Sequence, residues 1–276
     1  MTARIVIAAA ALLALRAAAA VAGEEEQGPA ATTGVEVNGT ALRVRLADGR
    51  TLGPHDLVGS TLEAADEAGR PLTVRVDAVT PDPRDPAGEV LLYRMMALGA
   101  DGAWRELCNP DPAGERWAFP LAGRWTAAGE HRPAAPGVFN VTCSSGAVGK
   151  CVRFGYKPWA TGPDGTSLWG HHQACVRMMR ADYCGDGTSF TRDGTLIDLY
   201  DRLGVQEDEP GPGMRFEAGW GADGATCVAR VRIPKNATLE GLARRCPGRL
   251  AERVGAVCTE DEARRSPATL LLNRSF

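Results

Sequence analysis

The stretch Leu168–Gly187, which has the sequence LWGHHQACVRMMRADYCGDG, decides how the second half of this chain folds. Apolar residues recur there at helical spacing, and this pattern predicts a helix over 168–183. His172 and Cys175 lie on one face of that helix, and Cys184-Gly185 ends it. The stretch therefore predicts a helix with a cysteine on its face and another at its end.

Strand patterns precede this helix. Within residues 34–107, apolar and polar residues alternate on both sides of Asn38-Gly39, which predicts a hairpin. The segments 90–98 and 104–107 flank Gly99–Gly102 and predict a second hairpin. This part of the chain therefore predicts a small antiparallel sheet or sandwich, and it contains no recognisable catalytic constellation.

The remaining segments are mixed. Residues 109–136 are rich in proline, glycine and alanine, and we expect them to wrap the surface. We expect strands at 139–143 and 150–156, and a short helix at 238–245 that is N-capped by Asn236 or Thr238. The predicted fold class is α+β, with a β-rich N-terminal region followed by a disulfide-stabilised mixed α/β domain with few short helices.

The N-terminus has the layout of a secretory signal peptide. A basic start precedes the apolar run Ile5–Leu15, and small residues at Ala20–Ala22 suit cleavage. The apolar run is too short to cross a bilayer comfortably, although an uncleaved N-terminal anchor is the alternative. We therefore predict a secreted, periplasmic or cell-surface protein without a membrane span once the signal is removed. The predicted segments are a signal peptide (1–22), a flexible lead-in (23–33), the β-rich region (34–107), a cysteine-containing domain (108–260) and a C-terminal tail (261–276).

Composition narrows the class of protein. Apolar residues make up 44% of the 276 residues and charged residues 24%, which is typical of a globular chain and excludes a mainly disordered one. Removal of residues 1–22 takes away Arg4 and Arg16 and changes the net charge from −3 to −5. This charge argues against general nucleic-acid binding.

Cysteine usage agrees with export. The chain has an even number of cysteines, which favours up to four disulfides in an oxidising compartment. Their spacing leaves the pairing open, and the absence of a CxxC pair makes a zinc site the weaker alternative. The eight residues are Cys108, Cys143, Cys151, Cys175, Cys184, Cys227, Cys246 and Cys258.

Several motifs together carry a family resemblance. They are Pro120–Trp125, Lys150–Trp159, His172–Cys175, Arg180–Gly187, Asp193–Asp201 and Cys246–Leu250. With these motifs the chain resembles the bacterial ADYC-domain family over about Cys108–Cys258. The resemblance implies export and a shared fold, and it supplies no reaction.

The residues around the helix end support three interpretations. In the structural one, Asp182 accepts backbone N–H bonds, Tyr183 fills the core and His172 is a buried histidine. In the second, Asp186, Asp193, Asp198 and Asp201 supply oxygen ligands to calcium. In the third, a secreted hydrolase uses His171 or His172 as general base with Asp182 as its orienting partner.

Aromatic residues form a further candidate site. Together with Trp220, the residues Tyr156, Trp159 and Trp169 would line a carbohydrate-binding surface, or they pack in the core and loops. We expect the structural interpretation to hold, without a cofactor. The predicted role is a non-enzymatic extracytoplasmic binding or structural module whose ligand or protein partner the sequence does not identify.

Overall fold

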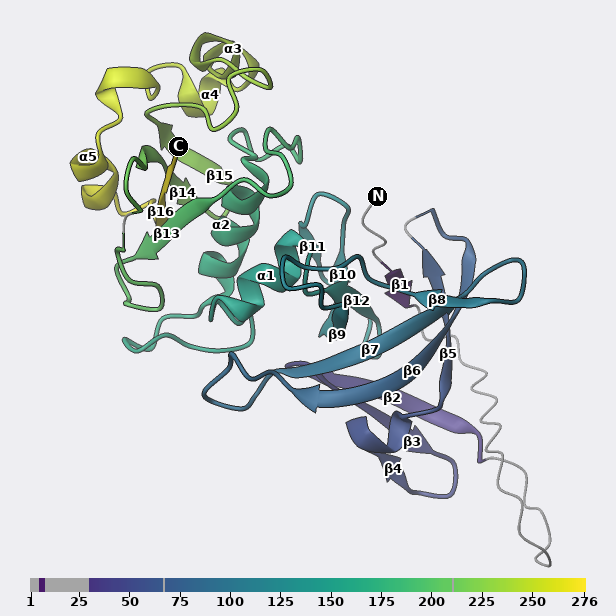
Figure 1. The fold of residues 1–276 in the computed structure, drawn as a ribbon. Coiled ribbons are helices and arrows are strands. Elements are labelled where there is room, and N and C mark those ends of the chain that lie inside the picture. Colours follow the sequence, from purple (N-terminus) through teal and green to yellow (C-terminus); the bar gives the residue numbers. More distant parts are fainter. Residues whose placement is uncertain (1–4, 8–29, 67, 210) are drawn as a thin grey trace, which may run out of the picture. The chain divides into compact units, whose positions relative to one another are not determined.

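The computed structural model describes residues 5–7, 30–66, 68–209 and 211–276 (Figure 1). Most of the predicted signal peptide (1–22), and residues 23–29 of the predicted lead-in, lie outside this part. The chain divides into two compact units. The first unit contains the described residues up to Thr126 together with His131–Gly149, and the second contains Ala127–Glu130 and Lys150–Phe276.

The first unit is built on an antiparallel sheet with the strand order β6-β5-β1-β12-β9-β7-β8. Because β6 also pairs with β7, six of these strands close into a barrel, and β8 extends beside β7. The strands are β1 (Ile5–Ile7), β5 (Thr61–Asp66), β6 (Pro71–Pro81), β7 (Leu91–Leu98), β8 (Trp104–Glu106), β9 (Trp117–Ala122) and β12 (Phe139–Cys143).

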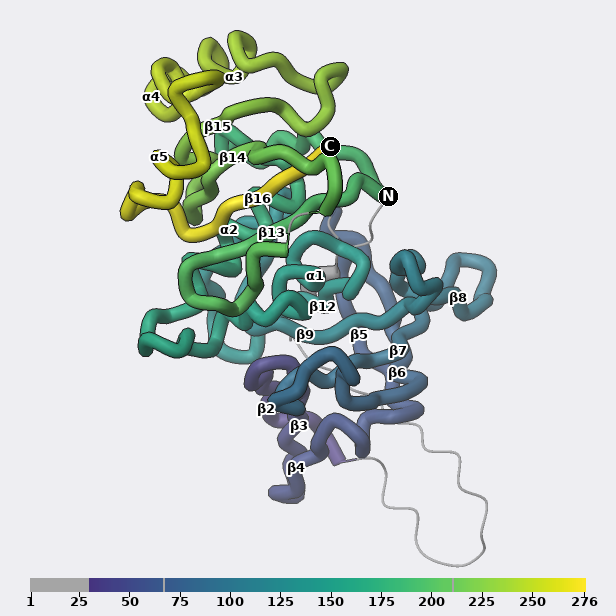
Figure 2. Tube along the Cα trace, turned by 60° about the vertical axis from the view of Figure 1, so that its left-hand side comes forward, coloured from purple at the N-terminus to yellow at the C-terminus, as the bar shows by residue number. Residues whose placement is uncertain are grey.

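A smaller sheet packs on this barrel in the order β2-β3-β4 (Figure 2). Its strands are β2 (Thr32–Asn38), β3 (Ala41–Leu46) and β4 (Thr51–Leu52), followed by a 3-10 turn, η1 (Pro54–Leu57). The hydroxyl of Tyr93 on β7 accepts a bond from the backbone N–H of Leu42 and donates to the carbonyl of Thr40. Both predicted hairpins are confirmed, as β2–β3 and β7–β8. A two-stranded ribbon completes the first unit, with β10 (Arg124–Trp125) and β11 (His131–Arg132).

The second unit contains an antiparallel sheet with the order β13-β16-β14-β15. Its strands are β13 (Ile197–Asp201), β14 (Arg215–Gly221), β15 (Gly224–Val228) and β16 (Leu271–Ser275). The helices are α2 (Trp169–Arg180), α3 (Leu239–Arg245), α4 (Pro247–Leu250), α5 (Glu260–Arg265) and the 3-10 turn η2 (Gly255–Val257), while α1 (Ala147–Arg153) spans the boundary between the units. In the described part of the chain, no helix is long and apolar enough to cross a membrane.

Helices cover both faces of this second sheet. Ala263 of α5 packs with Leu272 and Tyr200, while the next residue along β16, Asn273, points to the other face. On that other face Trp220 bonds to Asn273 and stacks on Tyr183, which follows α2. The segment 261–276, expected as a tail, therefore supplies part of α5 and an inner strand of the sheet.

Helix predictions held better than some strand predictions. The helix expected over 168–183 is α2, and the short helix at 238–245 is α3, capped by the Thr238 hydroxyl. The strand expected at 150–156 is wrong, because most of it belongs to α1, in which Val148, Cys151 and Val152 share one buried face. The expectation of a surface loop over 109–136 is wrong for β9, whose short apolar run is almost fully buried.

The structure is thus sheet-rich with few helices and fits the α+β class. All eight cysteines form disulfides. The pairs are Cys108–Cys143 in the first unit, and Cys151–Cys175, Cys184–Cys246 and Cys227–Cys258 in the second.

Candidate functional site

The candidate site begins where helix α2 ends. Ala181 has a left-handed backbone conformation (φ 49°), which turns the chain sharply after the helix. Its backbone N–H bonds back to the carbonyl of Met178. This turn brings the next three residues, Asp182, Tyr183 and Cys184, into the interior of the second unit, where each is buried.

The carboxylate of Asp182 is enclosed by donors. Its Oδ2 accepts a bond from Arg177 Nη1 at 2.6 Å and from the N–H of Gly187 at 3.0 Å. Its Oδ1 accepts the N–H of Gly185 at 2.9 Å. Asp182 is fully buried, so these bonds replace its hydration. The residue holds the turn together, as the structural interpretation predicted.

The hydroxyl of Tyr183 joins a buried ionic network. It donates to Glu217 Oε1 (3.1 Å) and accepts the backbone N–H of Arg232 (2.9 Å). Burial, and then the charge of Glu217, raise the pKa of Tyr183 well above its ordinary value. The phenol therefore stays protonated and acts as a fixed donor.

Glu217 and Arg232 form the centre of this network. Arg232 Nε and Nη2 bond to the two carboxylate oxygens of Glu217 at 2.9 and 3.0 Å, and neither side chain is exposed by more than 1%. Arg232 Nη2 also donates to the carbonyl of Met178, near the C-terminus of α2. Asn273 Nδ2 donates to Glu217, and Asn273 Oδ1 accepts the indole N–H of Trp220. Each of these polar atoms thus has a partner within the fold.

Sequence reasoning missed Glu217, Arg232 and Asn273. A signal for Glu217 was present, because this acidic residue lies inside the otherwise uncharged segment Phe216–Trp220. A carboxylate inside a buried strand requires a buried cation. Nothing local pairs it with Arg232, which lies 15 residues away, or with Asn273, which lies 56 residues away.

His171 and His172, the two histidines of helix α2, are both buried. His172 is fully buried, and Gln173 Nε2 lies 3.4 Å from its Nδ1. His171 is 6% exposed and stacks on the buried ring of Tyr156, with 6.2 Å between the ring centroids. Burial lowers the pKa of His171 below its ordinary value. The hydrolase interpretation paired one of these histidines with Asp182, whose two carboxylate oxygens accept bonds from Arg177, Gly185 and Gly187.

Tyr156 belongs to a second buried cluster. Its hydroxyl donates to Asp201 Oδ2 at 2.6 Å, and Asp201 also accepts backbone N–H bonds from Leu203 and Gln206. Burial and the charge of Asp201 raise the pKa of Tyr156 far above its ordinary value. Trp159 and Trp169 are each 36% exposed, whereas Tyr156 is fully buried. Tyr156 therefore contributes nothing to an exposed aromatic platform.

The four aspartates proposed as calcium ligands have separate surroundings. Asp186 pairs with Arg245 at 2.8 Å, and Asp198 pairs with Arg274 at 2.9 Å. Asp201 caps the turn after β13, and Asp193 is exposed. Among the described residues, no group of three or more His, Cys, Asp or Glu side chains could hold a metal ion.

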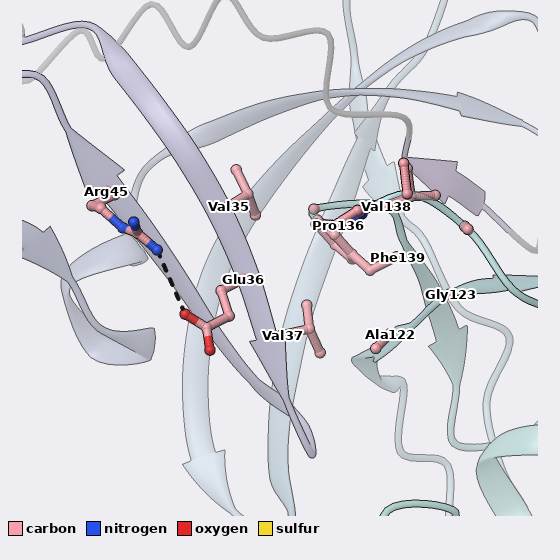
Figure 3. Close-up of a pocket in the computed structure, with 12 residues that line it drawn as sticks. Val35, Glu36, Val37, Arg45, Ala122, Gly123, Pro136, Val138 and Phe139 are labelled. Atoms are coloured by element: carbon pink, nitrogen blue, oxygen red, sulfur yellow. Dashed lines mark ion pairs between the residues drawn. The ribbon is translucent and has the colours of Figure 1, made fainter.

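Two surface hollows, one in each unit, are lined by other residues. In the first unit, a hollow of about 430 Å³ lies beside β2 and the segment 134–139 (Figure 3). In the second unit, a hollow of about 540 Å³ is lined by acidic residues that include Asp198, Glu207 and Glu209. Neither hollow is lined by His171, His172 or Asp182.

Comparison with known proteins identifies the family. The ADYC domain matches residues 54–234, which is more than half of the 276-residue chain. No curated protein and no solved structure matches the chain. The match begins well before Cys108, where the resemblance in the sequence motifs began, and so it includes most of the barrel strands. The chain belongs to the ADYC domain family.

Proposed function

We propose that this member of the ADYC family is an exported, disulfide-stabilised, non-enzymatic module that binds an extracytoplasmic partner or has a structural role. The proposal rests on the burial and bonding of the motif Ala181–Cys184. Each of its side chains is buried, and the polar ones are bound within the fold. Residues held in this way build a framework rather than a reactive centre.

The four disulfides support export. Disulfides persist in secreted and periplasmic proteins and are rare in the reducing cytosol. Three of them lie in the second unit, which also contains the buried ionic network. A framework of this kind suits a protein that must stay folded without access to chaperones of the cytosol.

The first test is native intact mass of the protein recovered from an oxidising compartment, combined with a thiol count. We expect a chain that begins near Gly23, has no reactive thiol, and has lost the eight hydrogens that four disulfides release. A retained leader would contradict export with cleavage. A bound calcium ion that raises the thermal midpoint would replace the proposal with a calcium-binding module.

The second test separates a structural Asp182 from a catalytic one. Asp182→Asn leaves Arg177 without its anionic partner and places an NH₂ group among donors. We therefore expect a loss of about 3 kcal/mol in the free energy of unfolding, measured by urea denaturation with the disulfides intact. Asp193→Asn is the matched control, because Asp193 is exposed, and it should change the value by less than about 0.5 kcal/mol.

A different pair of results would assign Asp182 to a catalytic site. If Asp182→Asn left stability unchanged but abolished turnover of an ester, peptide or glycoside substrate by the wild type, Asp182 would be an orienting residue. Loss of the same turnover in the double variant His171→Ala/His172→Ala would complete the case for a hydrolase. We expect no turnover by the wild type in the first place.

A further inference from the structure

The barrel of the first unit is closed by its shortest inner strand. β1 lies between β5 and β12 and pairs antiparallel with both. Val6 is opposite Asn140 on β12 and opposite Ala65 on β5. No other described strand occupies this position, so β1 alone joins these two edges.

The segment that supplies β1 is the one whose removal we propose. Residues 5–7 lie within the predicted signal peptide, and cleavage near Ala22 takes them away from the chain. β5 and β12 then each have an open edge. β12 is buried along its whole length in the intact barrel, and an uncovered edge next to buried apolar residues invites pairing with another chain.

A surface hollow lies along the path that a strand between β5 and β12 would follow beyond the position of Ile7. Because β1 and β12 are antiparallel, Ile7 is opposite Phe139, and a chain that continues past Ile7 passes Val138 and Pro136. These residues line the 430 Å³ hollow, together with Val35 and Val37 of the edge strand β2 (Figure 3). The lining also includes the ion pair of Glu36 with Arg45. The gap in the barrel and this hollow therefore follow one another along a single extended path.

We propose that the mature protein binds an extended segment of a partner protein by strand addition between β5 and β12. The occupant seen in the structure, Ile5-Val6-Ile7, indicates the chemistry of that segment, which is a run of β-branched apolar residues. Backbone bonds to both edges would hold the run, and small apolar residues after it would enter the hollow. This inference rests on the proposed function, since it requires export with removal of the leader.

The probe is a synthetic peptide with the sequence of residues 3–10, Ala-Arg-Ile-Val-Ile-Ala-Ala-Ala. The mature protein, with its N-terminus and four disulfides confirmed by intact mass, is studied by amide hydrogen exchange with and without the peptide. We expect roughly tenfold slower exchange in segments 65–66 and 139–141. A peptide with Val6→Pro should bind roughly tenfold more weakly, since proline lacks the N–H that a ladder needs.

A variant of the protein tests the hollow. Val138→Lys places a charge where the apolar end of the peptide would lie, and we expect it to weaken binding by roughly tenfold. Val58→Lys is the matched control, because Val58 is an exposed valine of the same unit that does not line the hollow, and it should leave binding unchanged.

The outcomes separate this inference from the proposed function. A correctly matured protein whose segments 65–66 and 139–141 are already protected, and do not respond to the peptide, would overturn the docking site and leave export intact. Exchange that responds equally to the Val6→Pro peptide would also overturn it. A protein that retains residues 5–7 would overturn both proposals, because its own strand would fill the gap.

Discussion

At the scale of single residues, the second unit depends on polar groups that are buried and bound. Tyr183, Glu217, Arg232 and Asn273 bond to one another in the interior, where an unmade hydrogen bond is costly. Tyr200 is different, because its buried hydroxyl makes no hydrogen bond of ordinary geometry in the described part of the chain. Burial, and then the nearby charge of Glu260, raise the pKa of Tyr200 above its ordinary value. The two tyrosines therefore offer a comparison of the same chemical deletion in two environments.

Tyr183→Phe should reduce the free energy of unfolding by about 1–3 kcal/mol, because it leaves the backbone N–H of Arg232 without its acceptor. Tyr200→Phe should reduce it by less, because the hydroxyl that it removes makes no well-formed hydrogen bond and only a weaker interaction with Glu260. Urea denaturation of both variants with the disulfides intact gives the two values. Equal losses would mean that the network around Tyr183 contributes nothing beyond packing.

Burial of His171 predicts a pH dependence. Burial lowers the pKa of His171 below 6.5, an effect that the charges of Asp201 and Asp164 partly offset and that of Arg202 reinforces. The unfolded chain therefore takes up a proton at a higher pH than the folded chain, so stability is present above pH 6.5 and is lost as the pH falls below it. The carboxylates whose pKa values are lowered, such as Asp186 and Asp208, lose their contribution only at lower pH.

The measurement is the free energy of unfolding between pH 7 and pH 5 for the wild type and for His171→Gln. We expect the variant to show the smaller decrease. His131→Gln controls for the other histidine whose pKa is lowered by burial. The same slope in His171→Gln as in the wild type would show that protonation of His171 is not linked to folding.

At the scale of elements, one disulfide of the second unit joins two turns and another joins the sheet to a turn. Cys184, just after α2, is bonded to Cys246, and Cys227 of β15 is bonded to Cys258. The first pair spans 62 residues and the second spans 31. Because loop-closure entropy increases with the logarithm of loop length, the longer bridge constrains the unfolded chain more strongly.

Replacing Cys184 and Cys246 by serine should therefore lower the free energy of unfolding by about 2–4 kcal/mol. The loss should exceed that of the Cys227/Cys258 double variant by about 0.6 kcal/mol, the value for a twofold difference in loop length. Guanidinium denaturation of the two double variants provides the comparison. A larger loss for the shorter bridge would show that native contacts, rather than chain entropy, decide these values.

Some of the elements could be predicted from the sequence, and others could not. The hairpins at Asn38-Gly39 and Gly99–Gly102, and helix α2, could be predicted because turn residues and periodicity are local signals. The segment 150–156 could not, because alternation over a few residues does not distinguish a short helix from a strand. The position of Asp182 at the helix end could be predicted from the sequence. The buried Glu217–Arg232 pair could not, because it depends on contacts between distant strands and loops.

At the scale of the whole molecule, the disulfides are distributed unevenly between the two units. The first unit has one disulfide, Cys108–Cys143, and the second has three. We expect reduction to increase amide exchange in the sheet β13–β16 more than in the barrel, as measured by hydrogen exchange with and without a reductant. Equal increases, or a larger increase in the barrel, would mean that the second unit does not depend on its bridges for stability.

The strand order of the second unit also bears on how the protein is made. β13 pairs only with β16 in this sheet, and β16 follows both β14 and β15 in the chain. While the ribosome is still adding residues 271–275, β13 has no neighbour and the sheet cannot be completed. A sheet with this strand order therefore cannot form progressively, strand by strand, as the second unit emerges from the ribosome.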